Sequence, residues 1–246
     1  MPYFNIVAET SENTVVTEYE PVKKRSDSYQ SEAALEQEFI RMLCEQGYEY
    51  LLIHTESDLV SNLRRQLEEL NHYTFSDTEW EDFFHNAIAN PNEHIVEKTR
   101  KIQEDHIQNL RRDDGSTKNI TLIDKKNIHN NRLQVINQYV VSTKDGAKHD
   151  NRYDVTVLVN GFPLVHIELK RRGVAIREAF NQIERYQRES FWSGSGLYEY
   201  IQIFVISNGA NTKYYSNSTR WNAEREHKKK GASKTKSSNS FEFTCF

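Results

Sequence analysis

Residues 151–173 read NRYDVTVLVNGFPLVHIELKRRG, and this stretch decides the fold of the chain around it. Two apolar, β-branched segments flank the turn residues 160–163, a pattern that predicts a β-hairpin. Because side chains alternate along a strand, His166, Glu168 and Lys170 should share one face while the residues between them point into the core. Two ionised groups, Glu168 and Lys170, should therefore project together from the second strand.

Asp154 in the first strand can add a second carboxylate to the face that carries Glu168. Asp154 stands opposite Glu168 only if the loop has an odd number of residues, and a three-residue loop over 160–162 would meet that condition. Two neighbouring carboxylates repel each other, and a hard divalent cation relieves that repulsion. We therefore expect Asp154 and Glu168 to bind Mg²⁺, for which Mn²⁺ should substitute. Lys170 would neutralise charge or orient a water molecule during hydrolysis of a nucleic-acid backbone.

A simpler interpretation of the same residues is an exposed strand face on which Glu168 and Lys170 form a solvated pair. Charged side chains are costly in an apolar hairpin, however, unless their face borders a cleft or water. His166 shares the face and is expected to be a hydrogen-bonded bystander.

Composition narrows the class of protein. A chain of 246 residues is long enough for one globular domain, 1–246, and its net charge of −4 indicates no general affinity for nucleic acid. Cys44 and Cys245 lie far apart, which argues against a disulfide framework or a zinc cluster. Without a signal sequence or a run of eighteen apolar residues, the sequence predicts a soluble cytoplasmic protein with no membrane partner.

The remaining sequence predicts a helical N-terminal half followed by a mixed α/β region. Apolar residues at helical spacing predict helices over about 31–46, 57–71, 77–89, 93–112 and 174–190. A period of two predicts strands over about 119–124, 133–142, 153–159, 164–170 and 200–207. The fold class is therefore α/β, with a mixed sheet flanked by helices.

Three segments have a different character. Residues 13–30 are polar and irregular, and residues 224–240 are rich in Lys and Ser, which predicts a flexible basic loop. Residues 241–246 are strand-like and have no polar tail, so we expect the chain to be the N-terminal fragment of a longer subunit.

The sequence quoted above resembles the PD-(D/E)xK nuclease motif, with Asp154 as the first acid, Glu168 and Lys170 as the second half, and Tyr153 where the motif has Pro. More narrowly, the chain resembles the N-terminal part of the R (HsdR) subunit of type I restriction-modification enzymes, in particular the class IC branch. This likeness extends from SYQSEAALEQEFI through NPNEHIVEKTRKI, LIDKKN, RGVAIREAFNQIERY and IFVISNG to the terminal FEFT.

The resemblance implies a restriction-endonuclease-like core that cuts unmethylated foreign double-stranded DNA away from the recognition site. Its partners would be the methylation and specificity subunits of the complex. In that family an ATP-driven motor follows the nuclease in the same polypeptide, but this chain has no phosphate-binding loop of the G-x-x-x-x-G-K-[ST] type. ATP would therefore act only in the full-length subunit.

The resemblance also implies roles for further residues. The Gln-x-x-x-Tyr motif of the family matches Gln182 and Tyr186, which lie one turn apart on a helix and are expected on the flank of its buried stripe. Arg171 and Arg172 are candidates for DNA contacts or for coupling to the motor. An additional acid from the first helix would be Glu32 or Glu36.

Three alternatives stay open. The chain could be a repair or recombination nuclease of the same superfamily, a docking domain that couples motor and partners without cutting, or a structural assembly module. Substrate preference would distinguish the first, and the response to divalent metal would distinguish the other two.

Overall fold

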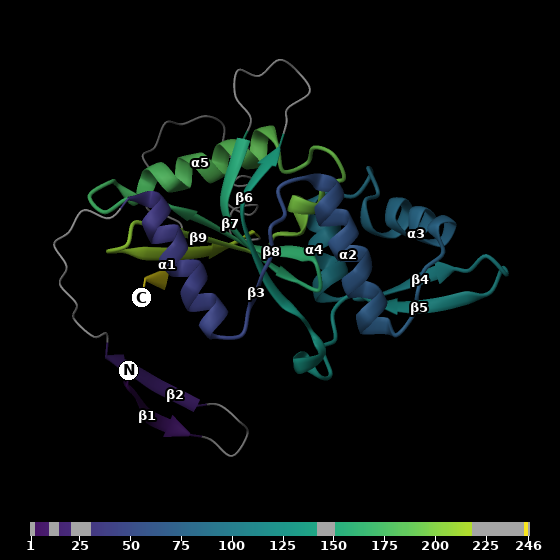
Figure 1. Cartoon of the computed structure of the whole chain (residues 1–246), viewed down its shortest axis with the longest axis horizontal. Coiled ribbons are helices and arrows are strands. Elements are labelled where there is room, and N and C mark those ends of the chain that lie inside the picture. Colours follow the sequence, from purple (N-terminus) through teal and green to yellow (C-terminus); the bar gives the residue numbers. More distant parts are fainter. Residues whose placement is uncertain (1–2, 10–14, 21–30, 142–150, 218–243, 246) are drawn as a thin grey trace, which may run out of the picture.

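The computed structural model of the chain describes residues 3–9, 15–20, 31–141, 151–217 and 244–245. Within these residues, the largest sheet has seven strands in the order β11-β10-β9-β8-β7-β6-β3 (Figure 1). Its pairs are antiparallel except β3 with β6 and β8 with β9, so the mixed sheet is confirmed. The strands are β3 (Glu49–Tyr50), β6 (Leu133–Val141), β7 (Asn151–Val159), β8 (Phe162–Leu169), β9 (Ile203–Ser207), β10 (Thr212–Ser216) and β11 (Thr244–Cys245).

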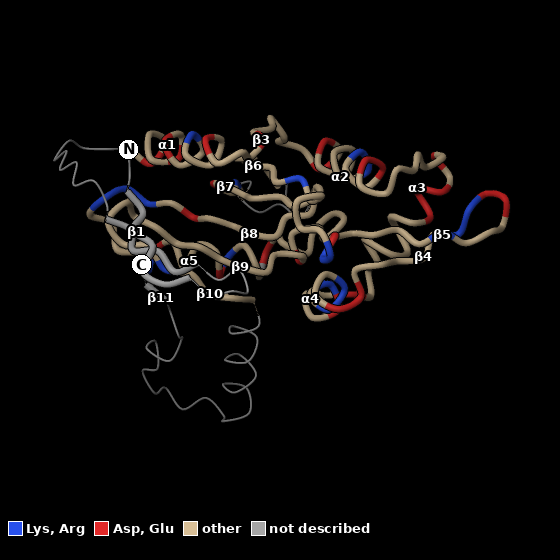
Figure 2. The backbone as a smooth tube through the Cα atoms, turned by 90° about the horizontal axis from the view of Figure 1, so that it is seen from below, with Lys and Arg blue, Asp and Glu red and all other residues tan. Residues whose placement is uncertain are grey.

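Helices α1 (Glu32–Glu45) and α5 (Ile176–Glu189) cover opposite faces of the sheet (Figure 2). The α1 face is aliphatic: Ile40 packs with Val155, Ile167 and Leu169. The α5 face belongs to the larger, aromatic-rich core of the molecule, to which Ile183 contributes. Because β8 is buried on both sides, any charged side chain in this strand lies in the interior.

The other helices lie beside the end of the sheet where β7 turns into β8 (Figure 1). They are α2 (Glu56–Asn71), α3 (Asp77–Phe83), which continues as a π-helix (Phe84–Ile88), and α4 (Ile95–Gln103). Short 3₁₀ turns occur at Ile128–Asn130 and Leu197–Tyr200. The predicted helices 31–46, 57–71, 77–89 and 174–190 are confirmed to within a few residues.

The predicted helix 93–112 is wrong in its second half. Helix α4 ends at Gln103, and β4 (Ile107–Arg111) pairs antiparallel with β5 (Thr117–Thr121). Residues 113–115 close this hairpin, with Gly115 at φ +80°. Pairing with β5 satisfies the backbone of 107–111 in an extended conformation, which the local sequence pattern did not reveal.

Two other predictions need comment. Residues 15–20, expected to be irregular, form β2 (Val15–Glu20), which pairs antiparallel with β1 (Tyr3–Glu9). The predicted basic loop 224–240 lies outside the described residues. In the part of the chain that is described, no helix combines the length and the apolar character needed to cross a bilayer.

The β7–β8 hairpin turns more tightly than predicted. Val159 pairs with Phe162, so the loop has two residues, Asn160 at φ +50° and Gly161 at φ +83°, not three. The register then shifts between Val157 and Leu158, where β8 contributes one extra residue, Leu164. This bulge restores the odd count, so Val155 pairs with Ile167 and the next pair along places Asp154 opposite Glu168.

Candidate active site

The acidic pair lies where β7 and β8 approach the start of α1. One carboxylate oxygen of Asp154, Oδ2, accepts a hydrogen bond of 2.9 Å from the backbone N–H of Leu169. The Glu168 side chain is completely buried, whereas Asp154 is partly exposed. The pair therefore has one buried member and one that reaches solvent.

Burial and mutual repulsion make this pair resist ionisation. Burial, followed by the charge of Glu168, raises the pKa of Asp154 to about 7. Burial also raises the pKa of Glu168 to about 7, although the neighbouring Lys170 ammonium opposes that shift. Among the described residues, Oε2 of Glu168 is a buried acceptor with no hydrogen-bond partner. A cation at this position would compensate both carboxylates.

Lys170 follows directly on the last residue of β8. Its ammonium donates to Oε1 of Glu168 at 3.0 Å and to the carbonyl of Leu169 at 3.2 Å. Its backbone N–H donates to the carbonyl of Ser207 at 2.8 Å, which extends the pairing of β8 with β9. The lysine is thus held beside the acids, not solvated away from them.

The two acids of the first helix also approach this end of the hairpin. Ser31 caps α1 by accepting from the N–H of Ala34, and Glu36 lies one turn after Glu32. Burial raises the pKa of Glu36, and the charge of Asp154 adds to this shift. Oε1 of Glu32 accepts from the N–H of Arg171 at 3.2 Å.

The partners of Glu36 were missed by the sequence reasoning. The side-chain amides of Asn137 and Gln138 each donate to one of its carboxylate oxygens, and Gln138 has a positive φ of 54°. A signal was present, because these two consecutive polar residues interrupt the apolar run of the strand. Among the described residues, no three His, Cys, Asp or Glu side chains gather as ligands of one ion.

Gln182 and Tyr186 lie next to each other on α5, as expected from their spacing. The Gln182 amide donates to the Tyr186 hydroxyl, which itself donates to the carbonyl of Arg152 at 2.7 Å. The prediction of a flank position is wrong for Tyr186, which is only 1% exposed and belongs to the core. Burial raises its pKa, and the charges of Glu168 and Asp154 contribute. The pair thus connects α5 to the strand that carries Asp154.

Tyr153, which stands in the position of the motif's Pro, is completely buried. Its hydroxyl and that of Ser190 are 2.6 Å apart, and the Asn151 amide donates to Ser190 at 3.1 Å. These contacts hold the beginning of β7 against the end of α5. The sequence did not predict these contacts, because residues 151 and 190 are far apart along the chain and meet only in the folded structure.

Basic residues, blue in Figure 2, occur in the connection between β8 and α5. Arg171 and Arg172 are exposed there, next to the acidic pair along the chain. Arg185 on α5 is also exposed; its guanidinium lies 5.3 Å from the Tyr186 ring centre, and its charge opposes the rise in the pKa of Glu168. These arginines form an exposed basic rim close to the acidic pair.

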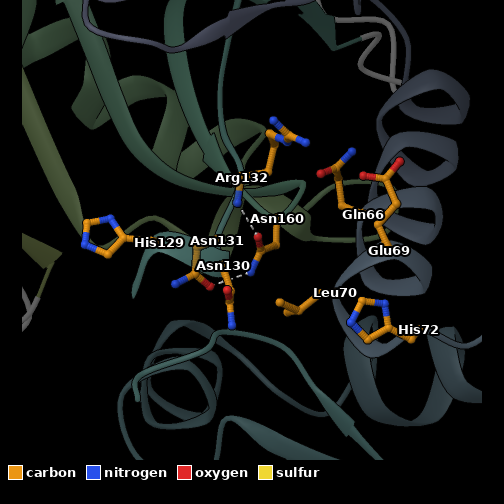
Figure 3. A pocket seen from close by; sticks show the side chains of 9 residues that line it. All are labelled: Gln66, Glu69, Leu70, His72, His129, Asn130, Asn131, Arg132 and Asn160. Carbon is orange, nitrogen blue, oxygen red and sulfur yellow. Dashed lines mark hydrogen bonds between the residues drawn. The ribbon is translucent and has the colours of Figure 1, made fainter. Parts of the chain in front are cut away.

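A polar cavity of about 310 Å³ lies at the other end of the hairpin, between α2 and the turn (Figure 3). The Asn160 side chain accepts from the N–H of Arg132 at 2.8 Å and donates to Asn131 Oδ1 at 2.8 Å. Asn131 in turn donates to the carbonyls of Asp124 and Ile128. These groups hold the turn and the segment before β6 together.

The chain is similar in sequence to several known proteins. A family model described as "Type I restriction enzyme R protein N terminus" matches residues 29–223. The chain is 48% identical over 215 residues to the type I restriction enzyme EcoprrI endonuclease subunit of Escherichia coli, which covers 87% of this chain. It is 40% identical over 195 residues, 77% of this chain, to the SauMSSORF170P endonuclease subunit of Staphylococcus aureus. It is also 33% identical over 107 residues, 43% of this chain, to a putative MjaIXP endonuclease subunit of Methanocaldococcus jannaschii.

These matches cover different shares of the relatives. The chain spans 67% of the Escherichia coli protein, 20% of the Staphylococcus aureus protein and 10% of the Methanocaldococcus jannaschii protein. The residues that the family model matches, 29–223, include the β7–β8 hairpin and α5.

Proposed function

Because the chain belongs to the type I restriction enzyme R protein family, matching its N-terminal model over residues 29–223, we propose that it is a metal-dependent endonuclease domain with a PD-(D/E)xK core. The whole chain, 1–246, would form this one domain, and the ATP-driven motor would belong to the full-length subunit. The observation that carries the proposal is the register of β7 and β8, which continues one residue beyond Val155 and Ile167 and so brings Asp154 beside Glu168. The Lys170 ammonium lies 3.0 Å from Oε1 of Glu168.

The acidic pair fits a hydrated divalent cation. The donors are carboxylate oxygens, the ligands that Mg²⁺ prefers, and the partial exposure of Asp154 leaves room for the several waters that Mg²⁺ retains. Asp154 and Glu168 would hold the ion, with Glu36 or Glu32 as a further acid nearby. When bound, Mg²⁺ would polarise the phosphodiester and lower the pKa of an attacking water.

The residues of this chain have distinct roles in the proposed hydrolysis. Lys170 balances the charge of Glu168 and supplies a donor next to the developing negative charge of the phosphate. Arg171 and Arg172 would bind the DNA backbone, which carries no sequence information. Gln182 and Tyr186 tie α5 to the strand of Asp154 and so position the rim against the acids.

The substrate would be unmethylated foreign double-stranded DNA in the bacterial cytoplasm. Cleavage would occur away from the recognition site, after translocation by the motor, in a complex with the methylation and specificity subunits. Recognition of a DNA sequence would belong to those partners, because the proposed contacts of this chain are with the DNA backbone, which carries no sequence information.

Calorimetric titration of Mn²⁺ in the presence of a short duplex tests this proposal. We expect Asp154→Ala and Glu168→Ala each to weaken Mn²⁺ binding about a hundredfold or more, because the ion loses one of two anionic ligands. Asp82→Ala, an exposed acid on α3, is the control and should bind as the natural sequence does. Identical titrations for all four proteins would contradict the nuclease proposal and favour a docking domain that does not cut.

A further inference from the structure

His166 is a buried polar side chain that the proposed mechanism does not use. It lies in the middle of β8, two residues before Glu168, and its side chain is 0% exposed. Three aromatic rings surround it, with centroid distances of 5.5 Å to Tyr153, 5.8 Å to Phe191 and 6.1 Å to Tyr186. The hydrogen bond expected of His166 is not seen, because neither ring nitrogen has a hydrogen-bond partner among the described residues.

Such an environment disfavours a histidine that serves only for packing. A buried polar group without a hydrogen bond destabilises the folded state, and an apolar side chain of similar size would avoid that cost. An aromatic ring would fit in the place of His166, since the three rings around it are those of Tyr and Phe. The imidazole therefore needs a polar partner that accounts for its presence.

The nearest candidate partner is Glu168. Nε2 of His166 lies 3.4 Å from Oε2 of Glu168, the same oxygen that has no hydrogen-bond partner among the described residues. The other oxygen, Oε1, accepts from Lys170. Burial lowers the pKa of His166 to about 4, so the ring is neutral and the contact is not an ion pair at neutral pH. A neutral imidazole can donate from only one nitrogen, and Nε2 is the one that faces an acceptor.

We propose that His166 is a positioning residue for Glu168: its Nε2–H donates to Oε2, which holds the carboxylate in one orientation next to Asp154 and Lys170. The separation of 3.4 Å is long for an N–H···O hydrogen bond, so the proposed bond requires a small change in the orientation of the two side chains. In this arrangement Oε2 of Glu168 accepts from His166, and Oε1 accepts from Lys170. The inference rests on the proposed metal site.

Partners of this kind are important for metal sites generally, because they restrict the orientation of the ligand and tune its basicity. Removing one lowers metal affinity by about 10- to 100-fold. His166 would act in the same way from within the sheet. The apolar residues around it would exclude water that could otherwise compete for Oε2.

The test compares His166→Gln with His166→Leu in the whole 246-residue chain. The amide nitrogen of Gln can occupy a place close to that of Nε2 and still donate, whereas Leu has similar volume and no donor. We expect His166→Leu to weaken Mn²⁺ binding about 10- to 100-fold by calorimetry, and His166→Gln to restore most of it. Equal weakening in both variants, or in neither, would overturn the inference.

Glu168→Ala in the same titration separates this inference from the proposed function. If Glu168→Ala binds Mn²⁺ normally, the proposed metal site is wrong. If Glu168→Ala loses binding but His166→Leu does not, only the role of His166 is wrong.

Nitrogen NMR of the natural sequence provides a measurement that needs no stable His166 variant. The ¹⁵N shifts of the His166 ring should show a proton on Nε2, with a shift typical of a hydrogen bond when Mg²⁺ is present. That signature should change in Glu168→Ala. A proton on Nδ1 would overturn the proposed contact.

Discussion

The two ends of the β7–β8 hairpin differ in how far their buried polar groups are hydrogen-bonded. At the turn, Asn160 makes four hydrogen bonds: its backbone N–H donates to Arg132, and its side chain bonds to Arg132, Leu122 and Asn131. At the acidic end, Glu168 and His166 are equally buried, yet among the described residues three of their polar atoms have no hydrogen-bond partner.

The difference separates a structural role from a functional one. Buried polar groups that only support a fold are usually saturated with hydrogen bonds, since each unsatisfied group destabilises the folded state. The turn obeys this rule, and the acidic end departs from it at the residues that would bind a metal. We therefore expect substitutions at the turn to affect mainly stability, and substitutions at the acidic end to affect mainly metal binding.

The largest effect on stability should come from Gly161→Ala. A Cβ at this position would lie 2.6 Å from the Cα of Leu63 in α2, and the φ of +83° is unfavourable for alanine. We expect the free energy of unfolding, measured by urea denaturation, to fall by about 3 kcal/mol or more, because backbone strain and overlap with a helix backbone add together.

Gly115→Ala is the matched control for this prediction. Gly115 has nearly the same φ, +80°, but a Cβ there would meet nothing within 4 Å. The loss should be only about 1 kcal/mol, the contribution of backbone strain alone. Equal losses at the two glycines would show that packing of the turn against α2 contributes little.

The acidic end should make stability depend on pH, in the absence of divalent metal. The pKa values of Asp154 and Glu168 are raised to about 7 in the folded state, so both carboxyls hold their protons more tightly there than in the unfolded chain. Their contribution to stability is full below the unfolded pKa, about 4, and is lost as the pH rises to about 7.

The measurement compares the natural sequence with the double variant Asp154→Asn/Glu168→Gln by urea denaturation between pH 4.5 and pH 8. The free energy of unfolding of the natural sequence, relative to the variant, should fall by about 1.4 kcal/mol per pH unit for each acid that stays protonated in the folded state, and then level off. Comparison with the variant reduces the effect of His166, whose lowered pKa acts in the opposite direction below pH 6.5. A constant difference would contradict the raised pKa values of the two acids.

A smaller effect should follow Glu168→Gln alone at pH 8 without metal. Removing a buried charge should raise the free energy of unfolding by about 1 kcal/mol. Glu79→Gln is the comparison, because Glu79 is also buried but accepts from Tyr73, Ser76 and Asp113, which lower its pKa. That variant should be destabilised, and a loss of stability in both variants would remove the distinction between the two kinds of acid.

Much of the fold could be predicted from periodicity. The helical spacing of Leu35, Phe39 and Leu43 predicted α1, and the β-branched alternation of 153–170 predicted the hairpin. The segment 107–111 could not be predicted in the same way, because its strand depends on a partner ten residues further along the chain. Local propensity is weak there, and pairing decides the conformation.

The candidate site, too, was predicted from the sequence only in part. The types and spacing of Asp154, Glu168 and Lys170 predicted a metal site, and the resemblance of this stretch to a nuclease motif turned that prediction into a nuclease hypothesis. The sequence anticipated the parity of the hairpin but not its cause, which is a two-residue turn combined with a bulge at Leu164. It also placed Tyr186 at the edge of its helix, whereas the aromatic core surrounds it.

By itself, the sequence determined which residues alternate, which faces are apolar and where chemistry can occur, since these follow from the order of side chains along a strand or helix. Only the tertiary structure decided what each polar atom meets: Glu36 with Asn137 and Gln138, and Glu168 with His166. The physical reason is that burial and hydrogen bonding depend on segments distant in sequence. Desolvation and partner charges then set the pKa values of these acids, and no local pattern encodes them.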